Sequence, residues 1–147
     1  MGRREMPLEH ADALSRGLLD IGRVSKQSGV SVKMIRHYEA IGLVQKPRRT
    51  SANYRVYSES DVHVLRFVRS ARELGFSMHE IGELLDLWRD RRRPSRKVKA
   101  LVTAHLHELE RRIADLQAMK STLAELAHNC HGDERPDCPI LERLEGN

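Results

Sequence analysis

The chain is poor in the residues that cross-link small domains and fill large cores. Of its 147 residues only two are cysteine, and aromatic residues make up 4%. It also has no apolar run long enough to cross a membrane and no apolar segment near its N-terminus typical of a secretory signal. These absences argue against a disulfide-rich secreted domain and against a membrane protein. We therefore expect a cytoplasmic protein with no membrane partner.

Charged residues, in contrast, make up 32% of the chain, and 26 Lys and Arg against 21 Asp and Glu give a net charge of +5. A positive surplus favours a polyanionic partner, although charge alone supports only non-specific attraction. With so few aromatic residues, we expect helices that each have one apolar face rather than a large buried sheet. The length suits one domain, or a small domain followed by an extended helix.

The two cysteines, Cys130 and Cys138, flank a short polar loop with the sequence C-H-G-D-E-R-P-D-C. We expect a long helix to end at residue 129 and a short one to begin at Pro139, with Cys138 as its N-cap. Two thiolates suit a soft metal ion, whereas the close cysteine pairs of a structural zinc site are missing. Judged from the loop alone, a disulfide or two unrelated cysteines fit equally well. Because cytoplasmic thiols stay reduced, metal binding or redox sensing is favoured over a structural disulfide.

Residues 20–42 predict a helix-turn-helix, with helices over 21–28 and 32–41. The residues expected to cap and end these helices are Asp20, Gly29, Ser31 and Gly42. We expect the second helix to present a basic side to the major groove of DNA and to turn Ile35 and Ile41 inward. That basic side carries Lys33, Arg36 and His37.

The stretch 46–57 predicts a wing, meaning a small hairpin beside the two helices. Its basic residues lead into a polar turn at 51–53, where Asn53 accepts left-handed backbone geometry. We expect Tyr54 and Arg55 to contact the sugar-phosphate backbone of DNA and Tyr57 to pack in the core.

Two further helices are predicted to begin at capping sequences, S-E-S-D from residue 58 and S-M-H-E from residue 77, and the first to end at Leu74–Gly75. Their expected core residues are Val62, Leu65, Val68, Ala71, Ile81, Leu84, Leu85 and Trp88. A charged break over 89–94 follows, which we interpret as a solvated loop.

Residues 95–129 contain no proline or glycine and predict one long helix. Apolar residues recur along it at alternating three- and four-residue steps, with Lys120 at the one interrupted position. This apolar seam consists of Val102, Leu106, Leu109, Ile113, Leu116 and Leu123. A seam of this length favours a coiled-coil homodimer over packing against the chain's own first domain. A dimer also suits DNA, because it presents two binding heads to two half-sites.

Taken together, these segments resemble the MerR family of transcriptional regulators over residues 19–145. The resemblance depends on R-H-Y-E followed by G-L-V, on N-Y-R-V-Y and on R-E-L-G-F-S. The C-terminal C-H-G-D-E-R-P-D-C-P-I is similar to the copper-efflux regulator branch of that family.

The resemblance implies specific site residues. It implies metal ligation by Cys130 and Cys138, and it gives a meaning to Ser95. Divalent-metal branches of the family carry a cysteine at the start of the dimer helix, and the monovalent branch carries serine. From the residues alone, Ser95 is simply the N-cap of that helix. The candidate DNA-binding residues are Lys33, Arg36, His37, Tyr38, Arg48, Tyr54 and Arg55.

We therefore expect a mainly α fold. Its segments are a flexible N-terminal extension (1–18), a winged helix-turn-helix DNA-binding domain (19–88), a long antiparallel coiled-coil dimerisation helix (95–129), and a metal-binding loop with a short helix (130–147). As the resemblance implies, the expected function is to activate copper-export and copper-homeostasis genes on binding Cu(I), with Ag(I) and Au(I) as alternatives. The homodimer would distort promoter DNA so that RNA polymerase can initiate.

Three alternatives stay open at this point. Zn(II) prefers four ligands and would have to recruit neighbours such as His131, which gives a divalent-metal sensor of the same fold. A thiol redox sensor would close a disulfide between the two cysteines. A metal-dependent enzyme is disfavoured, because Asp133, Glu134 and Asp137 lie on a short loop with little chain left to build a cleft.

Overall fold

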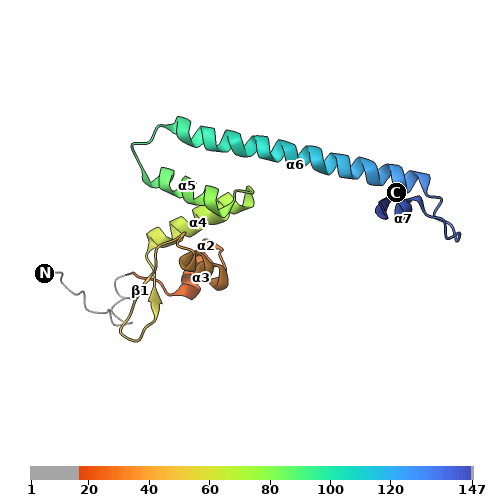
Figure 1. Cartoon of the computed structure of the whole chain (residues 1–147). Coiled ribbons are helices and arrows are strands. Elements are labelled where there is room, and N and C mark those ends of the chain that lie inside the picture. The colour runs from red at the N-terminus through yellow and green to blue at the C-terminus, as the bar shows by residue number, and fades with distance from the viewer. Residues whose placement is uncertain (1–16, 147) are drawn as a thin grey trace. The chain divides into compact units, whose positions relative to one another are not determined.

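The computed structural model describes residues 17–146 of the chain (Figure 1). It is mainly helical, with a two-stranded sheet. In chain order the elements are α2 (Ile21–Ser28), α3 (Val32–Ala40), β1 (Arg48–Arg49), β2 (Arg55–Val56), α4 (Glu59–Glu73), α5 (Met78–Arg89), α6 (Ser95–Asn129) and α7 (Pro139–Leu144). Two compact units divide inside α6, one up to Val98 and one from Lys99 onward, and each is described by itself. The predicted N-terminal extension lies outside the described residues up to residue 16.

The helix-turn-helix forms where the capping residues predict it. The Asp20 carboxylate accepts a hydrogen bond from the backbone N–H of Arg23 at 2.8 Å, and the Ser31 hydroxyl accepts one from Met34 at 3.2 Å. Gly29 ends α2 with a positive φ of 72°, a conformation that glycine adopts without steric cost. The prediction for Ile41 was wrong, because α3 ends at Ala40 and the Ile41 side chain is 48% exposed. As the C-cap, Ile41 lies beyond the helical face that buries Ile35.

The wing is an antiparallel pair of two-residue strands, in which Arg48 pairs with Val56 and Arg49 with Arg55. The chain just before α2 joins this sheet. Leu19 and Tyr57 exchange two backbone hydrogen bonds of 2.7 Å each. The wing is therefore tied to the start of the domain, and Tyr57 is buried as predicted.

Helices α4 and α5 both begin with capping boxes, formed by Ser58 with Asp61 and by Ser77 with Glu80. Their predicted core residues are buried, apart from Trp88, which is 40% exposed. The Trp88 ring stacks on Phe67 with centroids 4.7 Å apart, so one face of the indole is covered. The largest fully buried side chains of this unit are Val24, Ile35, Tyr38, Leu65, Val68, Ile81 and Leu85.

Helix α6 runs without interruption over the 35 residues that the sequence predicts. Most of its apolar seam is exposed in the single chain, with Leu116 at 63% and Ile113 at 54%. The short helix α7 follows the cysteine loop and exposes Leu141 and Leu144. Within the described residues, no helix combines the length and the apolar character needed to span a membrane.

Candidate DNA-binding surface and metal loop

Helix α3 has a buried side and a basic exposed side. Ile35 is buried, whereas Lys33, Arg36 and His37 are all exposed. Residues three and four apart share one face of a helix, so the spacing that buries one side turns these three side chains outward together. The structure thus brings three of the candidate DNA-binding residues onto one surface.

Tyr38 lies on the opposite side from these three residues. Its side chain is 2% exposed, and its hydroxyl accepts a hydrogen bond of 2.7 Å from Nη1 of Arg72 in α4. A ring this deeply buried packs α3 against α4 and offers almost no surface to an external partner. We therefore leave Tyr38 out of the candidate contact surface.

The wing exposes its turn and the residues beside it. Tyr54 is 62% exposed, and Arg48 is also at the surface. The turn is held by hydrogen bonds between the backbones of Thr50 and Tyr54 at 2.9 Å and of Asn53 and Thr50 at 2.9 Å. The Asn53 φ of 66° confirms the left-handed conformation predicted at this position. The wing is thus a structured protrusion with a cation and an aromatic ring at its surface.

Arg55 is partly buried and is paired with an acidic residue that the sequence interpretation overlooked. Its Nε lies 3.2 Å from Oε2 of Glu39, and its side chain is 27% exposed. The Tyr57 hydroxyl donates to the other oxygen of Glu39, Oε1, at 2.5 Å. Burial, followed by this hydrogen bond, raises the pKa of Tyr57 well above its ordinary value. In the sequence, the signal for this role was that Glu39 is the acidic residue of an otherwise basic helix.

Charge is divided unevenly between the two units. Residues 17–98 contain 17 Lys and Arg against 9 Asp and Glu, a net charge of +8, whereas residues 99–146 contain 6 against 9, a net charge of −3. The positive charge of the whole chain therefore belongs to the unit that carries α3 and the wing. This is the charge that a phosphate backbone attracts.

The cysteine loop matches its predicted local structure. Cys138 is the N-cap of α7 and Pro139 its first residue, while Gly132 in the loop has a φ of 65°. Cys130 and Cys138 are both unbonded thiols of intermediate exposure. The loop therefore leaves both sulfurs available as ligands.

One acidic residue of the loop, Asp133, is already engaged by a neighbour. Asp133 accepts hydrogen bonds from the backbone N–H of Arg135 at 2.9 Å and from its Nε at 2.8 Å. These contacts hold the pKa of Asp133 below its ordinary value. Among residues 17–146, no three His, Cys, Asp or Glu side chains lie together in a way that would hold a metal ion. The donor set that the described loop offers is thus a pair of thiols.

Ser95 is the first residue of α6 and is exposed. The N-cap role predicted for Ser95 does not hold, because Ser95 is already the first helical residue. At about 1.5 Å of rise per residue, the 35 residues of α6 extend for about 50 Å. Ser95 and Cys130 of one chain are therefore far apart along the same helix.

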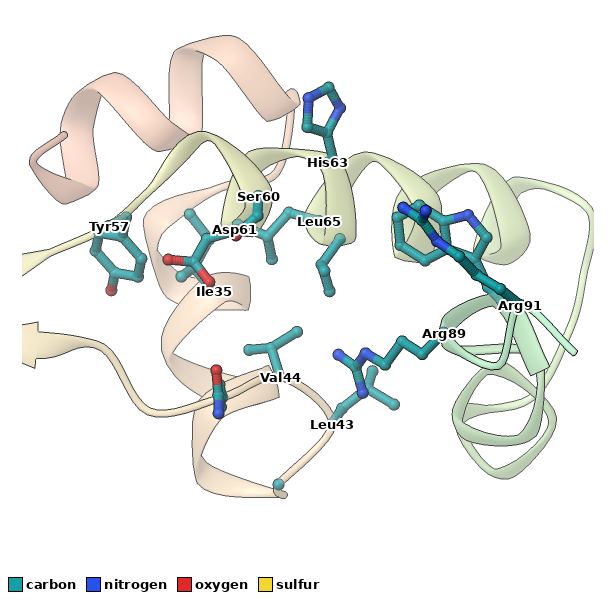
Figure 2. A pocket seen from close by; sticks show the side chains of 14 residues that line it. Ile35, Leu43, Val44, Tyr57, Ser60, Asp61, His63, Leu65, Arg89 and Arg91 are labelled. Carbon is teal, nitrogen blue, oxygen red and sulfur yellow. The ribbon is translucent and has the colours of Figure 1, made fainter. Parts of the chain in front are cut away.

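A cavity of about 750 Å³ lies in the N-terminal unit, between the end of α3, the start of α4 and the end of α5 (Figure 2). Figure 2 shows apolar Ile35, Val44 and Leu65 on one side, with Arg89 and Arg91 on the other. None of the candidate DNA-binding residues and neither cysteine lines it. The cavity is therefore separate from both candidate sites.

Two family descriptions match the chain. "MerR HTH family regulatory protein" matches residues 19–88, and "MerR, DNA binding" matches residues 62–126. Together they cover both capped helix pairs, the wing and most of α6.

Individual relatives extend over most of the sequence. The "Heavy metal-dependent transcription regulator 2" of Rhizobium meliloti (strain 1021) is 59% identical over 126 residues, which is 86% of this chain and 86% of that protein. The "HTH-type transcriptional regulator CueR" of Salmonella typhimurium (strain LT2) is 41% identical over 128 residues, covering 87% of this chain and 93% of that protein.

Among solved structures, the transcription regulator PbrR691 of Ralstonia metallidurans CH34 in complex with lead(II) has a similar fold. It superposes with a TM-score of 0.75 at 31% identity and covers 86% of this chain and 98% of that one. The chain thus shares its fold with this solved structure.

Proposed function

Because the chain belongs to the MerR family of helix-turn-helix transcriptional regulators, we propose that it is a metal-responsive regulator that activates copper-export and copper-homeostasis genes on binding Cu(I). Its relatives are regulators, and it is a regulator rather than an enzyme. In this proposal residues 19–88 bind DNA, residues 95–129 form the dimer, and residues 130–147 hold the metal. The DNA would be promoter DNA in the cytoplasm.

The DNA-binding part of the proposal is supported by surface and charge. Lys33, Arg36 and His37 on α3 suit the base edges and phosphates of the major groove, and Arg48, Tyr54 and Arg55 suit the sugar-phosphate backbone beside it. The +8 charge of residues 17–98 supplies the long-range attraction. These contacts are made by one unit, so a dimer would carry two such surfaces.

The dimer is supported by the exposed seam of α6. Apolar residues at coiled-coil spacing bury their surface against a second helix. An antiparallel pair of α6 helices would bring Ser95 of the partner subunit near Cys130, across a distance that one chain cannot cover. The resemblance assigns that serine to monovalent-metal sensing, since it cannot provide a third thiolate.

The observation that carries the copper assignment is the donor set. Cys130 and Cys138 are unbonded, and the nearby carboxylate of Asp133 is held by Arg135. Two thiolates suffice for Cu(I), Ag(I) or Au(I), whereas Zn(II) prefers four ligands. Of the relatives, one is named CueR, and the structure of another contains lead(II). A divalent-metal sensor that recruits His131 is therefore the second candidate.

The regulatory step would be a change of DNA shape. The metal-bound loop would become ordered, α6 would pass this change to the two heads, and the promoter between them would be distorted so that RNA polymerase can initiate. Metal should then change DNA shape more than DNA affinity, because both sites bias the same conformational equilibrium. A thiol redox sensor would instead respond to oxidation of the two cysteines.

The proposal is tested by anaerobic titration of the reduced protein with Cu(I) against a chelator of known affinity. We expect one tightly bound Cu(I) per chain, lost in both Cys130→Ser and Cys138→Ser and unchanged in Glu134→Gln, an exposed loop residue that is not a thiol. Competing Zn(II) should not displace Cu(I) from the wild-type protein.

Two further results separate the alternatives. Tight Zn(II) binding that is lost in His131→Ala would contradict the copper assignment and favour a divalent sensor. A rapid, reversible loss of two hydrogens after peroxide treatment, with no high-affinity Cu(I) site, would favour the redox sensor.

A further inference from the structure

Three side chains meet beneath the wing, and two of them have no assigned part in DNA binding. Glu39 comes from the end of α3 and is 6% exposed, and Tyr57 follows β2 and is also buried. The third, Arg55, belongs to β2. We call these three residues the Glu39 cluster. It joins the groove-facing helix to the wing across 18 residues of sequence.

Both oxygens of the Glu39 carboxylate are used. Oε1 accepts from the Tyr57 hydroxyl at 2.5 Å, and Oε2 lies 3.2 Å from Nε of Arg55. The Arg55 Nε–H is not aligned for a hydrogen bond with Oε2, so the attraction is electrostatic. A buried carboxylate is costly unless it is paired. The position of this charge is thus determined by two partners from the wing.

The pairing orients Arg55. Its Nε atom is buried 3.2 Å from Oε2 of Glu39, and because the guanidinium is a rigid plane, this attraction restricts the region that its two terminal nitrogens can reach. The side chain remains 27% exposed although its Nε is buried, so its exposed part lies elsewhere on the side chain. A phosphate contact by Arg55 would therefore be prepared before DNA arrives.

We propose that Glu39 is a positioning residue for DNA recognition, which holds the Arg55 fork in a fixed relation to the basic face of α3. The groove contact and the phosphate contact are then made by one rigid piece, and the wing cannot move independently of the recognition helix. This inference rests on the proposed DNA-binding function. It adds a residue that touches no DNA and yet sets the geometry of binding.

The role differs from that of an ordinary core residue. Glutamine has nearly the same size as glutamate and can accept the Tyr57 hydrogen bond, but it lacks the charge that attracts Arg55. Glu39→Gln therefore keeps the packing and removes the orienting force. The effect should pass through Arg55 and through no other DNA-contacting residue.

The experiment is a double-mutant cycle on DNA affinity. An operator is first selected from random duplex DNA with the wild-type dimer, and dissociation constants are then measured at one fixed salt concentration. We expect Glu39→Gln and Arg55→Ala each to weaken operator binding about ten-fold, the loss typical of a charged hydrogen-bonding contact. The double variant should bind no worse than Arg55→Ala, because Glu39 acts only through Arg55.

Controls separate positioning from folding. Glu83→Gln makes the same chemical change at an exposed glutamate of α5 and should leave operator binding unchanged. Arg55→Lys keeps the positive charge but loses the planar fork. With Glu39 unchanged, this variant should weaken operator binding almost as much as Arg55→Ala. Cu(I) affinity should be the same in all of these variants.

The positioning role would be overturned if Glu39→Gln or Arg55→Lys bound the operator with wild-type affinity. It would also be overturned if the losses of the two single variants multiplied in the double variant. In each of these cases the DNA-binding proposal itself would stand. If the wild-type protein enriches no DNA sequence at all, both this inference and the DNA-binding proposal fail.

Discussion

At the scale of single residues, the wing depends on one left-handed position. Asn53 has a φ of 66°, and its carbonyl oxygen accepts a hydrogen bond of 3.1 Å from Nη1 of Arg49. The same Nη1 lies 3.4 Å from the side-chain oxygen of Asn53. Asparagine tolerates this conformation better than most residues, because its short amide bonds locally. The turn therefore adopts this conformation without a glycine at residue 53.

This position gives a prediction about stability. Asn53→Ala should destabilise the protein by about 1 kcal/mol, because alanine pays the steric cost of the left-handed region and loses the amide contact. Asn53→Gly should stay within about 0.5 kcal/mol of wild type, since glycine adopts the conformation freely. Urea unfolding followed by circular dichroism measures both. Equal stability of the alanine variant and wild type would show that the turn relaxes to another geometry.

At the scale of elements, the helices of the N-terminal unit are delimited by local hydrogen bonds. At the start of α4, the Ser58 hydroxyl accepts from the backbone of Asp61 at 3.4 Å, and the Asp61 carboxylate accepts from the backbone of Ser58 at 2.9 Å. These two bonds satisfy backbone donors that no helical partner can reach. Because α4 begins directly after the wing, its cap also fixes where the wing ends.

We expect Ser58→Ala to lower the free energy of unfolding by about 1 kcal/mol, the usual effect of removing an N-cap. Ser70→Ala, at an exposed position near the other end of α4, is the matched control and should be neutral or slightly stabilising, because alanine is the better helix former. Thermal melts of the two variants measure the difference. A melting temperature of Ser58→Ala no lower than that of Ser70→Ala would mean that the cap contributes nothing measurable.

At the scale of the whole molecule, α6 is a long helix whose apolar seam is largely exposed among the described residues 17–146. Ile113, Leu116 and Leu123 are all more than half exposed. Burying one such side chain stabilises an assembly by about 1.5–3 kcal/mol, so several of them together favour association strongly. Lys120 interrupts the seam, and a polar residue at such a position selects register at a cost in stability. The proposed DNA-binding unit and metal loop are thus attached to a helix for which we propose a second copy of the chain as partner.

Leu116→Glu should therefore convert the proposed dimer into a monomer. The operator affinity of this variant should fall at least to that of the wild-type protein for an operator with one half-site. Ala118→Glu introduces the same charge at an exposed position off the seam and should leave the dimer intact. Sedimentation velocity at micromolar concentration distinguishes the two outcomes. A dimer that persists in Leu116→Glu would show that the chain associates through a surface other than this seam.

Local signals in the sequence determined where most of the helices begin. Caps, glycine turns and helical periodicity act over a few residues, so Asp20, Ser31, Ser58 and Ser77 begin helices where expected. The long helix 95–129 was also predictable, because nothing within it competes with helix formation. The family resemblance, which depends on short motifs, was confirmed by the comparisons.

The tertiary structure decided which side chains face one another. Only the fold shows that Tyr38 is bonded to Arg72, 34 residues away, and is therefore buried. It likewise shows that Trp88 is only half covered by Phe67 and that Glu39 meets Tyr57 and Arg55 beneath the wing. Hydrophobic patterns report that a residue faces inward or outward, but pairing between distant residues follows from how the elements pack. Local hydrogen bonds thus fixed the parts of this protein, and long-range packing fixed the Glu39 cluster.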